Sequence, residues 1–228
     1  MNKMDLINIV PSFTNNHIKA SFSLSCFSSS KKNDRLLFAQ KTGFNHKNLI
    51  IPIQTHSPNI AFCSTPRIVQ NCDGVFTDNH ENVCSIQVAD CMPIFFGHCT
   101  IPVFGVIHVG WRGLTNGIIQ KVSSLFKSKD YNLNDFEIVI GPSIRSCCFE
   151  VKQDIINKFN NNFIISNKGD SYNIDLQSNA HYDLVDTGFD GGKIHSMKNC
   201  TYCDGNKFHS YRRDGKDSGR MIGLIGIK

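Results

Sequence analysis

Residues 83–126 read VCSIQVADCMPIFFGHCTIPVFGVIHVGWRGLTNGIIQKVSSLF. Apolar runs in this stretch predict three strands, at Val83–Val88, Met92–Phe96 and Pro102–His108. Unbroken apolar runs of this length are typical of strands that are covered on both faces. A helix is predicted to follow, because apolar residues recur at helical spacing at Leu114, Ile118, Val122, Leu125 and Phe126. The stretch therefore indicates buried strands that lead into an amphipathic helix.

The middle of this stretch also resembles a membrane span. Residues 91–111 contain no Asp, Glu, Lys or Arg, and 21 residues are enough to cross a bilayer. Proline and glycine interrupt the segment repeatedly, at Pro93, Gly97, Pro102, Gly105 and Gly110. Because its apolar stretches are short, we expect two buried strands joined by a turn and no membrane partner.

The composition is that of a globular chain of ordinary size. With 228 residues, 40% hydrophobic and 19% charged, the sequence fits one domain and excludes a disordered, collagen-like or fibrous protein. Basic residues number 24 against 19 acidic ones, which gives a net charge of +5. They are scattered, whereas a nucleic-acid binder concentrates them in a dense patch. We therefore attribute the charge to solubility and expect no nucleic-acid partner.

Further elements are predicted on either side of the opening stretch. Strand-like runs occur at Leu49–Gln54, Phe136–Ile140 and Met221–Ile227, and Lys152–Phe163 is predicted to form a second helix. Strands and helices do not alternate strictly, which favours one mixed domain over a regular βαβ array.

The cysteines are interpreted as free thiols. The N-terminal segment MNKMDLINIVPSF has an apolar run of about five residues, shorter than the roughly 7–15 residues of a signal peptide, so we expect a cytoplasmic protein. In a reducing compartment the ten cysteines stay unpaired. Cys147–Cys148 is interpreted as a pair of small buried residues. Cys200–Cys203 is a CxxC pair without a second pair at zinc-finger spacing, so it is interpreted as structural.

Reactive side chains follow three of the predicted strands, in Gln54–Ser57, Ala89–Cys91 and Ile107–Gly113. Two histidines and one cysteine, His56, Cys91 and His108, form a plausible zinc set that leaves the fourth position open. Their spacing matches no short zinc motif. Two alternatives remain open at this point: satisfied core residues, or a metal-free pair with Cys91 as nucleophile and His108 as base.

Arginines form a second candidate constellation. Arg112 lies between two glycines at a predicted helix start, where anions are favoured. Arg212 and Arg213 are adjacent near the C-terminus, and paired guanidinium groups bind phosphate or carboxylate with two hydrogen bonds. The alternative is a surface turn with solvated arginines.

Taken together and in this order, several segments resemble the YfiH-type purine nucleoside phosphorylase family, whose members are also described as polyphenol-oxidising laccases. The segments are Gln54–His56, Asp73–Thr77, Ala89–Pro93, His108–Gly113, Ile140–Ile144, Cys200–Thr201, Ser210–Arg213 and Gly219–Arg220. The resemblance covers residues 49–228. It implies an α+β fold, a single-domain four-layer αββα sandwich with mixed sheets over residues 1–228, in which residues 1–48 are divergent and shortened.

The resemblance also implies an activity. We expect a zinc-dependent enzyme, with copper as the alternative metal, that cleaves adenosine, inosine, guanosine or 5′-methylthioadenosine with phosphate to the free base and ribose 1-phosphate. Adenosine deaminase activity is expected as a second reaction of the same site. We expect a monomer whose partners are the purine nucleoside and phosphate.

The resemblance implies the metal ligands, and the needs of the reaction suggest roles for the other residues. His56, Cys91 and His108 are expected to bind the metal, with Cys91 and His108 also counted as catalytic. Asp90 is expected to orient His108 or to transfer a proton. Arg112 is the first candidate for binding phosphate, followed by Arg212 and Arg213.

Two features separate this chain from the family's descriptions. A multicopper oxidase needs closely paired histidines, whereas the nine histidines here include no His-x-His pair. Members of the family carry an Arg followed by a Gly pair after a Phe-Ser segment, and Phe22–Ser28 has neither. The alternatives to a phosphorylase are therefore an amide or ester hydrolase that uses Cys91 and His108, and an inactive nucleoside-binding homologue.

Overall fold

The computed structural model describes residues 6–8, 13–27 and 34–228. Two six-stranded sheets form its framework, and each contains both parallel and antiparallel neighbours. The first sheet has the strand order β1 (Leu6–Asn8), β2 (Ile18–Ser23), β15 (Met221–Ile227), β7 (Val83–Val88), β3 (Leu49–Pro52) and β5 (Ile68–Val69). The second has the order β14 (Ile194–Ser196), β10 (Phe136–Ile140), β8 (Met92–His98), β9 (Phe104–Val109), β6 (Gly74–Thr77) and β4 (Ile60–Phe62).

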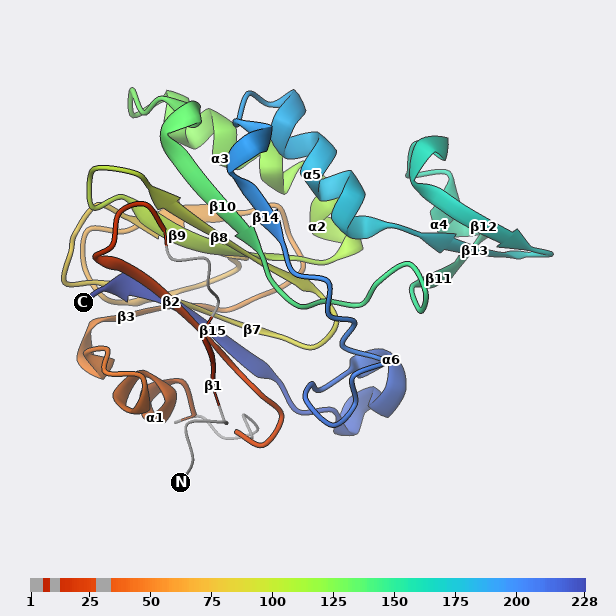
Figure 1. Ribbon diagram of the computed structural model, residues 1–228, viewed down its shortest axis with the longest axis horizontal. Helices are drawn as coiled ribbons and strands as arrows, with labels where there is room; N and C mark the ends of the chain where they lie inside the picture. Colours follow the sequence, from red (N-terminus) through yellow and green to blue (C-terminus); the bar gives the residue numbers. More distant parts are fainter. Residues whose placement is uncertain (1–5, 9–12, 28–33) are drawn as a thin grey trace.

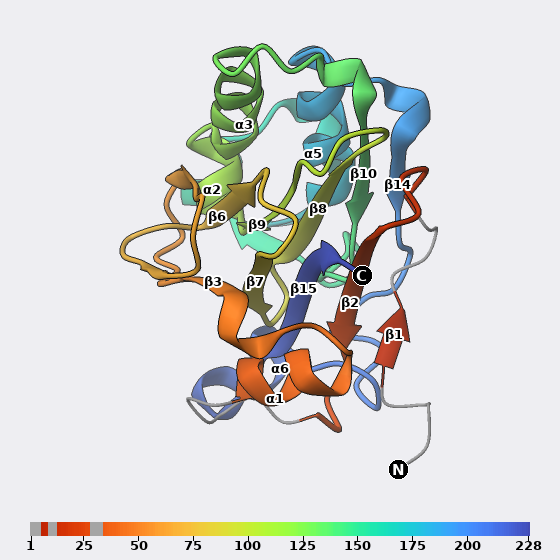
Figure 2. The same cartoon turned by 90° about the vertical axis from the view of Figure 1, so that its left-hand side faces the viewer.

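Helices cover the outer faces of the two sheets. The first sheet is covered by α1 (Asp34–Lys41), and the second by α2 (Trp111–Thr115), α3 (Ile118–Lys127) and α5 (Leu176–Asp186) (Figures 1 and 2). The protein is thus a single-domain α+β sandwich with four layers in the order αββα, as the resemblance to the family implies.

Strand β8 shows why the central strands are apolar throughout. Side chains alternate between the two faces of a strand. Ile94 and Phe96 pack into the cluster under the helices, where they join Phe126 of α3. Phe95 points the other way, into the cluster between the two sheets, together with Val106 of β9. Burial on both faces therefore favours apolar residues at consecutive positions such as these.

All six predicted strands are present. Val83–Val88, Phe136–Ile140 and Met221–Ile227 have the predicted bounds, and the other three differ by one or two residues. Residues 91–111 hold the whole of β8 and β9, which confirms two buried strands in that stretch. Within the described ranges, no helix combines the length and the apolar character needed to cross a membrane.

The helix predicted at Lys152–Phe163 is wrong. Only the short α4 (Gln153–Ile156) and a 3₁₀ turn at Asn161–Phe163 form there. The Asn160 side chain accepts a hydrogen bond from the backbone N–H of Asn162 at 3.0 Å, and such local bonds compete with helix formation.

A small sheet extends away from the sandwich. It consists of β11 (Glu150–Lys152), β13 (Ser171–Ile174) and β12 (Ile164–Lys168), and it projects to the right in Figure 1. Near its base lies the short α6 (Tyr211–Asp214), whose Ser210 N-cap accepts a hydrogen bond from the backbone N–H of Arg213 at 3.2 Å. Phe149, directly before β11, and Tyr211 and Arg212 of α6 lie next to the place where the reactive side chains meet.

Candidate active site

The three predicted strand ends meet where the chain passes from the first sheet to the second. His56 follows β3, Cys91 lies in the turn between β7 and β8, and His108 is the second-last residue of β9. The candidate ligand atoms of these three residues lie within 4.8 Å of one another, and the two imidazole ring centroids are 4.8 Å apart. Folding therefore brings together three side chains whose spacing along the chain matches no short motif.

The backbone around these side chains is unusual. His56 and Asp90 have φ angles of 59° and 80°, in the left-handed region that residues other than glycine rarely adopt. Each of these backbone conformations costs about 1–3 kcal/mol, and strain of this kind concentrates at functional sites. Gly110 completes the arrangement, since a Cβ atom there would lie 2.9 Å from the Cys91 sulfur and 3.3 Å from Cδ2 of His56.

Asp73 organises the site, although the sequence analysis assigned it no role. Its buried carboxylate accepts hydrogen bonds from the backbone N–H groups of Thr55, His56 and Ser57 at 3.1, 3.0 and 2.7 Å. Its Oδ1 lies 2.8 Å from Nδ1 of His108, which leaves Nε2 of that ring for a metal ion. Burial raises the pKa of Asp73, but hydrogen bonds from His108 and Ser57 outweigh it and hold the pKa well below its usual range.

In the metal-free protein, Cys91 and His108 shift each other's pKa. Burial raises the pKa of the Cys91 thiol, but His108 and His56 outweigh it and lower the pKa to about 6. Burial lowers the pKa of His108, but Cys91 and Asp73 outweigh it and raise the pKa to about 9. At neutral pH the pair is therefore thiolate and imidazolium, and an incoming cation displaces the imidazolium proton.

The donor set fits a zinc ion. One thiolate and two imidazoles are ligands that zinc prefers, and three protein ligands leave a fourth position for substrate or water. The carboxylate of Asp73 behind His108 is the arrangement that fixes a zinc-binding histidine in one tautomer and orientation. The residues present thus fit the metal that the resemblance implies.

Asp90 forms hydrogen bonds with other partners than the predicted one, His108. Its Oδ1 accepts a hydrogen bond from the Thr201 hydroxyl at 2.7 Å, and its Oδ2 accepts one from the Ser210 hydroxyl at 3.0 Å and one from the backbone N–H of Arg212 at 2.6 Å. The expectation that Asp90 orients His108 is wrong, because both of its oxygens bind the C-terminal segment and another carboxylate bonds to that ring. Proton transfer by Asp90 stays a prediction.

A cavity of about 740 Å³ opens beside the three candidate ligands. This volume is in the range of small-molecule sites. Its lining includes three aromatic side chains and four arginines: Trp111, Phe149, Tyr211, Arg35, Arg112, Arg212 and Arg220. Among the residues that the structure describes, Asp90 contributes the one carboxylate of that lining. The excess of guanidinium groups favours an anionic ligand.

Two of the three arginines predicted to bind phosphate line this cavity. The exposed Arg112 lies with its guanidinium carbon 4.3 Å from the centroid of the Trp111 ring. Arg212 donates from Nη1 to the carbonyl oxygen of Cys148 at 3.2 Å, and its guanidinium carbon lies 5.5 Å from the Phe149 ring centroid. Both side chains retain donors that a phosphate can use.

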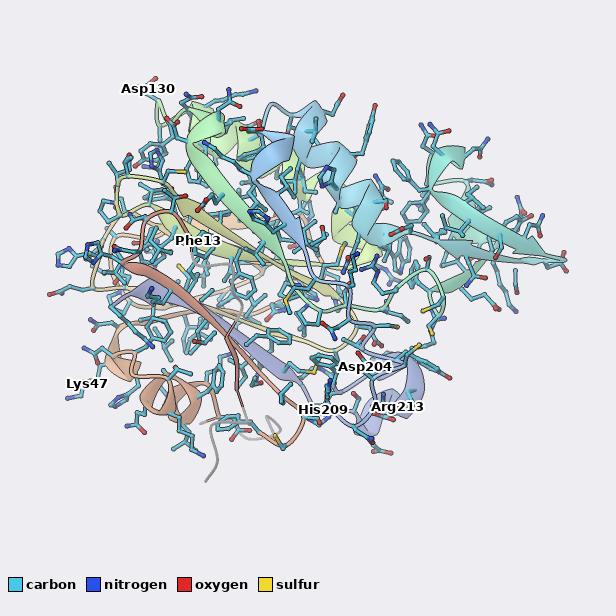
Figure 3. The ribbon with its side chains drawn as sticks, in the orientation of Figure 1. Phe13, Lys47, Asp130, Asp204, His209 and Arg213 are labelled. Atoms are coloured by element: carbon cyan, nitrogen blue, oxygen red, sulfur yellow. The ribbon has the colours of Figure 1, made fainter. Side chains whose placement is uncertain are left out.

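Arg213 does not line the cavity, which corrects the third expectation. Its guanidinium donates to the carbonyl oxygens of Thr201, Tyr202 and Phe208 at 3.0–3.2 Å and forms an ion pair with Asp214 at 2.8 Å. Figure 3 shows it at α6, in the same corner of the molecule as Asp204 and His209. Because these contacts occupy its donors, Arg213 stabilises the C-terminal turn.

Arg35 of α1 is a cavity residue that the sequence analysis missed. It is buried, and its guanidinium donates to Ser85 Oγ at 3.0 Å, Gln87 Oε1 at 3.2 Å and Gln54 Oε1 at 3.3 Å. In the described part of the chain, no carboxylate lies within ion-pair distance of it. Burial lowers its pKa to about 10, so it remains charged at neutral pH. A buried cation with only neutral partners at a cavity wall favours an anion there.

Arg35 lies in segment 1–48, which the resemblance implies to be divergent and to lack an Arg followed by a Gly pair. Helix α1 nevertheless brings a guanidinium to the cavity from this part of the chain. The sequence around Arg35 does not indicate this role, because Arg35 is one of several polar residues in a short helix.

Comparison with known proteins identifies related sequences. A family model described as multi-copper polyphenol oxidoreductase laccase matches residues 28–228. The chain is similar to the purine nucleoside phosphorylase SA1030 of Staphylococcus aureus (strain N315), with 30% identity over 209 residues that cover 84% of this chain and 78% of that protein. It is also similar to the purine nucleoside phosphorylase YlmD of Geobacillus stearothermophilus, with 28% identity over 166 residues, 69% of this chain and 61% of that protein.

Solved structures share the fold. The hypothetical protein YfiH of Bacillus licheniformis superposes with a TM-score of 0.86 and 25% identity, over 93% of this chain and 94% of that one. YlmD of Geobacillus stearothermophilus superposes with a TM-score of 0.87 and 23% identity, over 96% and 94%. The resemblance inferred from the ordered sequence segments is confirmed.

Proposed function

Since this chain belongs to the family described as multi-copper polyphenol oxidoreductase laccase, we propose that it is a zinc-dependent purine nucleoside phosphorylase, the activity for which its relatives are named. One observation carries the proposal: the His56, Cys91 and His108 set opens on a cavity that also contains four arginines. A metal site next to an anion site suits a reaction between a nucleoside and phosphate.

The reaction defines what the cavity must do. Phosphorolysis breaks the bond between the anomeric carbon of ribose and the purine nitrogen, and it forms a bond from that carbon to a phosphate oxygen. The phosphate must be positioned, and the charge that develops on sugar and base must be stabilised. We assign the phosphate to Arg35 and Arg212, which are held by hydrogen bonds at 3.0–3.3 Å, and to the exposed Arg112.

His56, Cys91 and His108 would hold the zinc ion. When bound there, the ion supplies Lewis acidity toward an electronegative atom of the substrate. Asp73 fixes both the His56 backbone and the His108 ring, and Gly110 leaves room for the Cys91 sulfur. Zinc is proposed in preference to copper because one cysteine and two histidines match its catalytic sites, and a single such site cannot supply a four-electron oxidase.

The purine is assigned to the aromatic part of the lining. Trp111, Phe149 and Tyr211 offer flat faces for a base, and all three line the cavity. Adenosine, inosine, guanosine and 5′-methylthioadenosine present the same bicyclic ring to these side chains. The open fourth ligand position favours adenosine deamination as a second activity, in which water replaces the 6-amino group to give inosine and ammonia.

A metal-free hydrolase is the second candidate function. It is favoured by the lowered pKa of Cys91, about 6, beside His108, because a thiolate next to an imidazolium is an activated nucleophile. In that mechanism Cys91 attacks an amide or ester carbonyl and His108 protonates the leaving group. An inactive nucleoside-binding homologue is the third possibility.

Product analysis separates these functions. Purified zinc-loaded protein is incubated with adenosine, with and without phosphate, beside Cys91→Ala and a matched Cys99→Ser control from the turn after β8. We expect adenine and ribose 1-phosphate only with phosphate, and loss of both products in Cys91→Ala alone. Inosine without adenine would restrict the enzyme to deamination. Full ester hydrolysis in chelator, with a trapped acyl group on Cys91, would overturn the metal-dependent function.

A further inference from the structure

Four cysteines from two separate turns lie together beside the cavity, and the proposed function does not use them. The Cys147 sulfur is 3.5 Å from that of Cys148 and 3.7 Å from those of Cys200 and Cys203, and the sulfurs of Cys148 and Cys203 are 3.3 Å apart. All four sulfurs lie within 4.8 Å of one another. Interpreting Cys147 and Cys148 as small buried residues was wrong, because Cys147 is exposed and Cys148 is half-buried. Folding supplies each cysteine pair with the partner that its local sequence lacks.

The distances match a metal site. Four sulfurs that bind one zinc ion tetrahedrally at about 2.3 Å are about 3.8 Å from one another. Bonded disulfide sulfurs are only about 2.05 Å apart, and all four of these cysteines are free thiols. The cluster is therefore spaced for a shared cation.

Hydrogen-bond donors and cations lie next to the cluster. The backbones of Cys203 and Arg145 form hydrogen bonds with the Cys200 sulfur. Backbone donors to sulfur are characteristic of metal-bound cysteines. The side chains of Arg145 and Arg212 are anchored next to the cluster, on the carbonyl oxygens of Met197 and Cys148 at 3.0 and 3.2 Å. Their charges offset that of a tetrathiolate.

We propose that Cys147, Cys148, Cys200 and Cys203 bind a second zinc ion as a structural site. Four thiols bind one Zn²⁺ as thiolates and release four protons, so the site has a net charge of −2 and no oxidant takes part. Protein sulfurs fill all four positions, which is the pattern of a structural rather than a catalytic zinc site.

The site joins two segments of the cavity wall. The first turn continues into Phe149, which lines the cavity, and the second contains Thr201, whose hydroxyl holds Asp90 at 2.7 Å. The direct links between the two turns in the described chain include the β-bridge of Ser143 with Cys200 and the hydrogen bond from the Thr201 N–H to the Ser143 carbonyl oxygen at 3.1 Å. A metal ion bound to both turns would fix their separation and with it the width of the cavity at this wall.

Zinc stoichiometry in the full-length chain tests the proposal. Protein is purified under reducing conditions and its zinc is measured by elemental analysis for wild type, His56→Ala, Cys203→Ser and a Cys99→Ser control. We expect two ions per chain in wild type and in Cys99→Ser, and one in each of the other two variants. The double variant with His56→Ala and Cys203→Ser is expected to hold none.

Cobalt substitution identifies the ligands of the second ion. In the His56→Ala background, Co²⁺ alone is added to metal-free protein, and a tetrathiolate site gives strong sulfur-to-cobalt charge-transfer bands with tetrahedral ligand-field bands. We expect these bands to disappear with Cys203→Ser and to persist with Cys99→Ser. Because Cys203 is exposed, circular dichroism should show the native fold in the variant, with a lower Tm.

The outcomes separate this site from the proposed function. If the protein holds one zinc ion that persists in His56→Ala and disappears in Cys203→Ser, the four-cysteine site is supported. The same result would show that His56, Cys91 and His108 bind no zinc. The reverse pattern would overturn the inference. So would finding copper in place of zinc, or disulfides among these cysteines in protein alkylated under denaturing, non-reducing conditions.

Discussion

Oδ1 of Asp73 lies 2.8 Å from Nδ1 of His108, and the same carboxylate receives the backbone N–H groups of Thr55, His56 and Ser57. One buried side chain therefore positions two candidate metal ligands that come from different strands. These hydrogen-bond donors stabilise the negative charge of the Asp73 carboxylate. The carboxylate can therefore fix His108 in the tautomer whose Nε2 is free to bind a metal ion.

Replacing Asp73 with asparagine tests this relationship. The amide keeps the size but loses the charge, and its single oxygen cannot accept all of these hydrogen bonds. We expect zinc affinity at the His56, Cys91 and His108 site to fall about 10- to 100-fold, measured by competition with a chelating dye. Asp78→Asn, at an exposed position after β6, serves as the matched control. Unchanged zinc affinity in Asp73→Asn would show that His108 needs no orienting carboxylate.

Arg35 provides a second prediction, on phosphate. Its guanidinium is buried, and its hydrogen-bond partners in the described ranges are neutral, so an incoming phosphate would give it an anionic partner. Loss of hydrogen bonds to a charged group costs about 1.5–3 kcal/mol. We therefore expect Arg35→Met to reduce kcat/KM for phosphate about 10- to 100-fold while adenosine binding is retained.

The control for this prediction is Arg67→Met, an exposed arginine outside the cavity. Arg35→Lys keeps the charge and should recover part of the activity. If Arg35→Met retains the wild-type dependence on phosphate concentration, the side chain has a structural role toward Gln54 and Gln87 alone.

The strands could be predicted because strands buried on both faces appear in the sequence as unbroken apolar runs. Phe95 and Phe96 face opposite layers, so both must be apolar. Helix α5 shows the limit of this approach. Its buried face includes Gln177, which donates to Ser143 Oγ at 2.8 Å, and Asn179. Buried polar residues that find partners in the tertiary structure interrupt the apolar periodicity, and the helix goes unrecognised.

The candidate site was only partly predictable for a related reason. His56, Cys91 and His108 each follow or end a recognisable strand, but only the resemblance to the family implies that the three gather around one metal ion. The roles of Asp73 and Arg35, and the pairing of the two cysteine turns, depend on contacts between segments far apart in the chain. Arg213 shows the converse error, because a neighbouring Asp214 and three carbonyl oxygens occupy a guanidinium that its sequence position made a candidate.

The third prediction concerns the close packing of Gly110 against the Cys91 sulfur. A Cβ atom at this position would lie 2.9 Å from the Cys91 sulfur, whereas one at Gly113 would meet nothing closer than 3.5 Å. We expect Gly110→Ala to displace the sulfur, to reduce zinc occupancy of the site and to abolish activity. Gly113→Ala is the matched control, and we expect it to retain zinc and to gain about 0.5–1 kcal/mol in helix stability. Zinc content and thermal unfolding measure both, and full zinc occupancy in Gly110→Ala would contradict the geometry.

The last prediction concerns the pH dependence of Cys91 in the metal-free protein. Burial raises the pKa of this thiol, but His108 and His56 lower it to about 6, whereas an ordinary cysteine has a pKa of about 8.5. The thiolate is the reactive form, so alkylation by iodoacetamide should rise as pH increases through about 6 and then level off. Peptide mass spectrometry measures the rate at each pH, and added zinc should suppress it.

Two comparisons make this result specific to the Cys91–His108 pair. Burial raises the pKa of Cys99, so that cysteine should stay slow to react at neutral pH in the same samples. His108→Ala removes the main group that lowers the Cys91 pKa while burial remains, so the midpoint should move to about 8.5 or above. A midpoint near that value already in the metal-free wild type would mean that Cys91 and His108 do not form a thiolate–imidazolium pair.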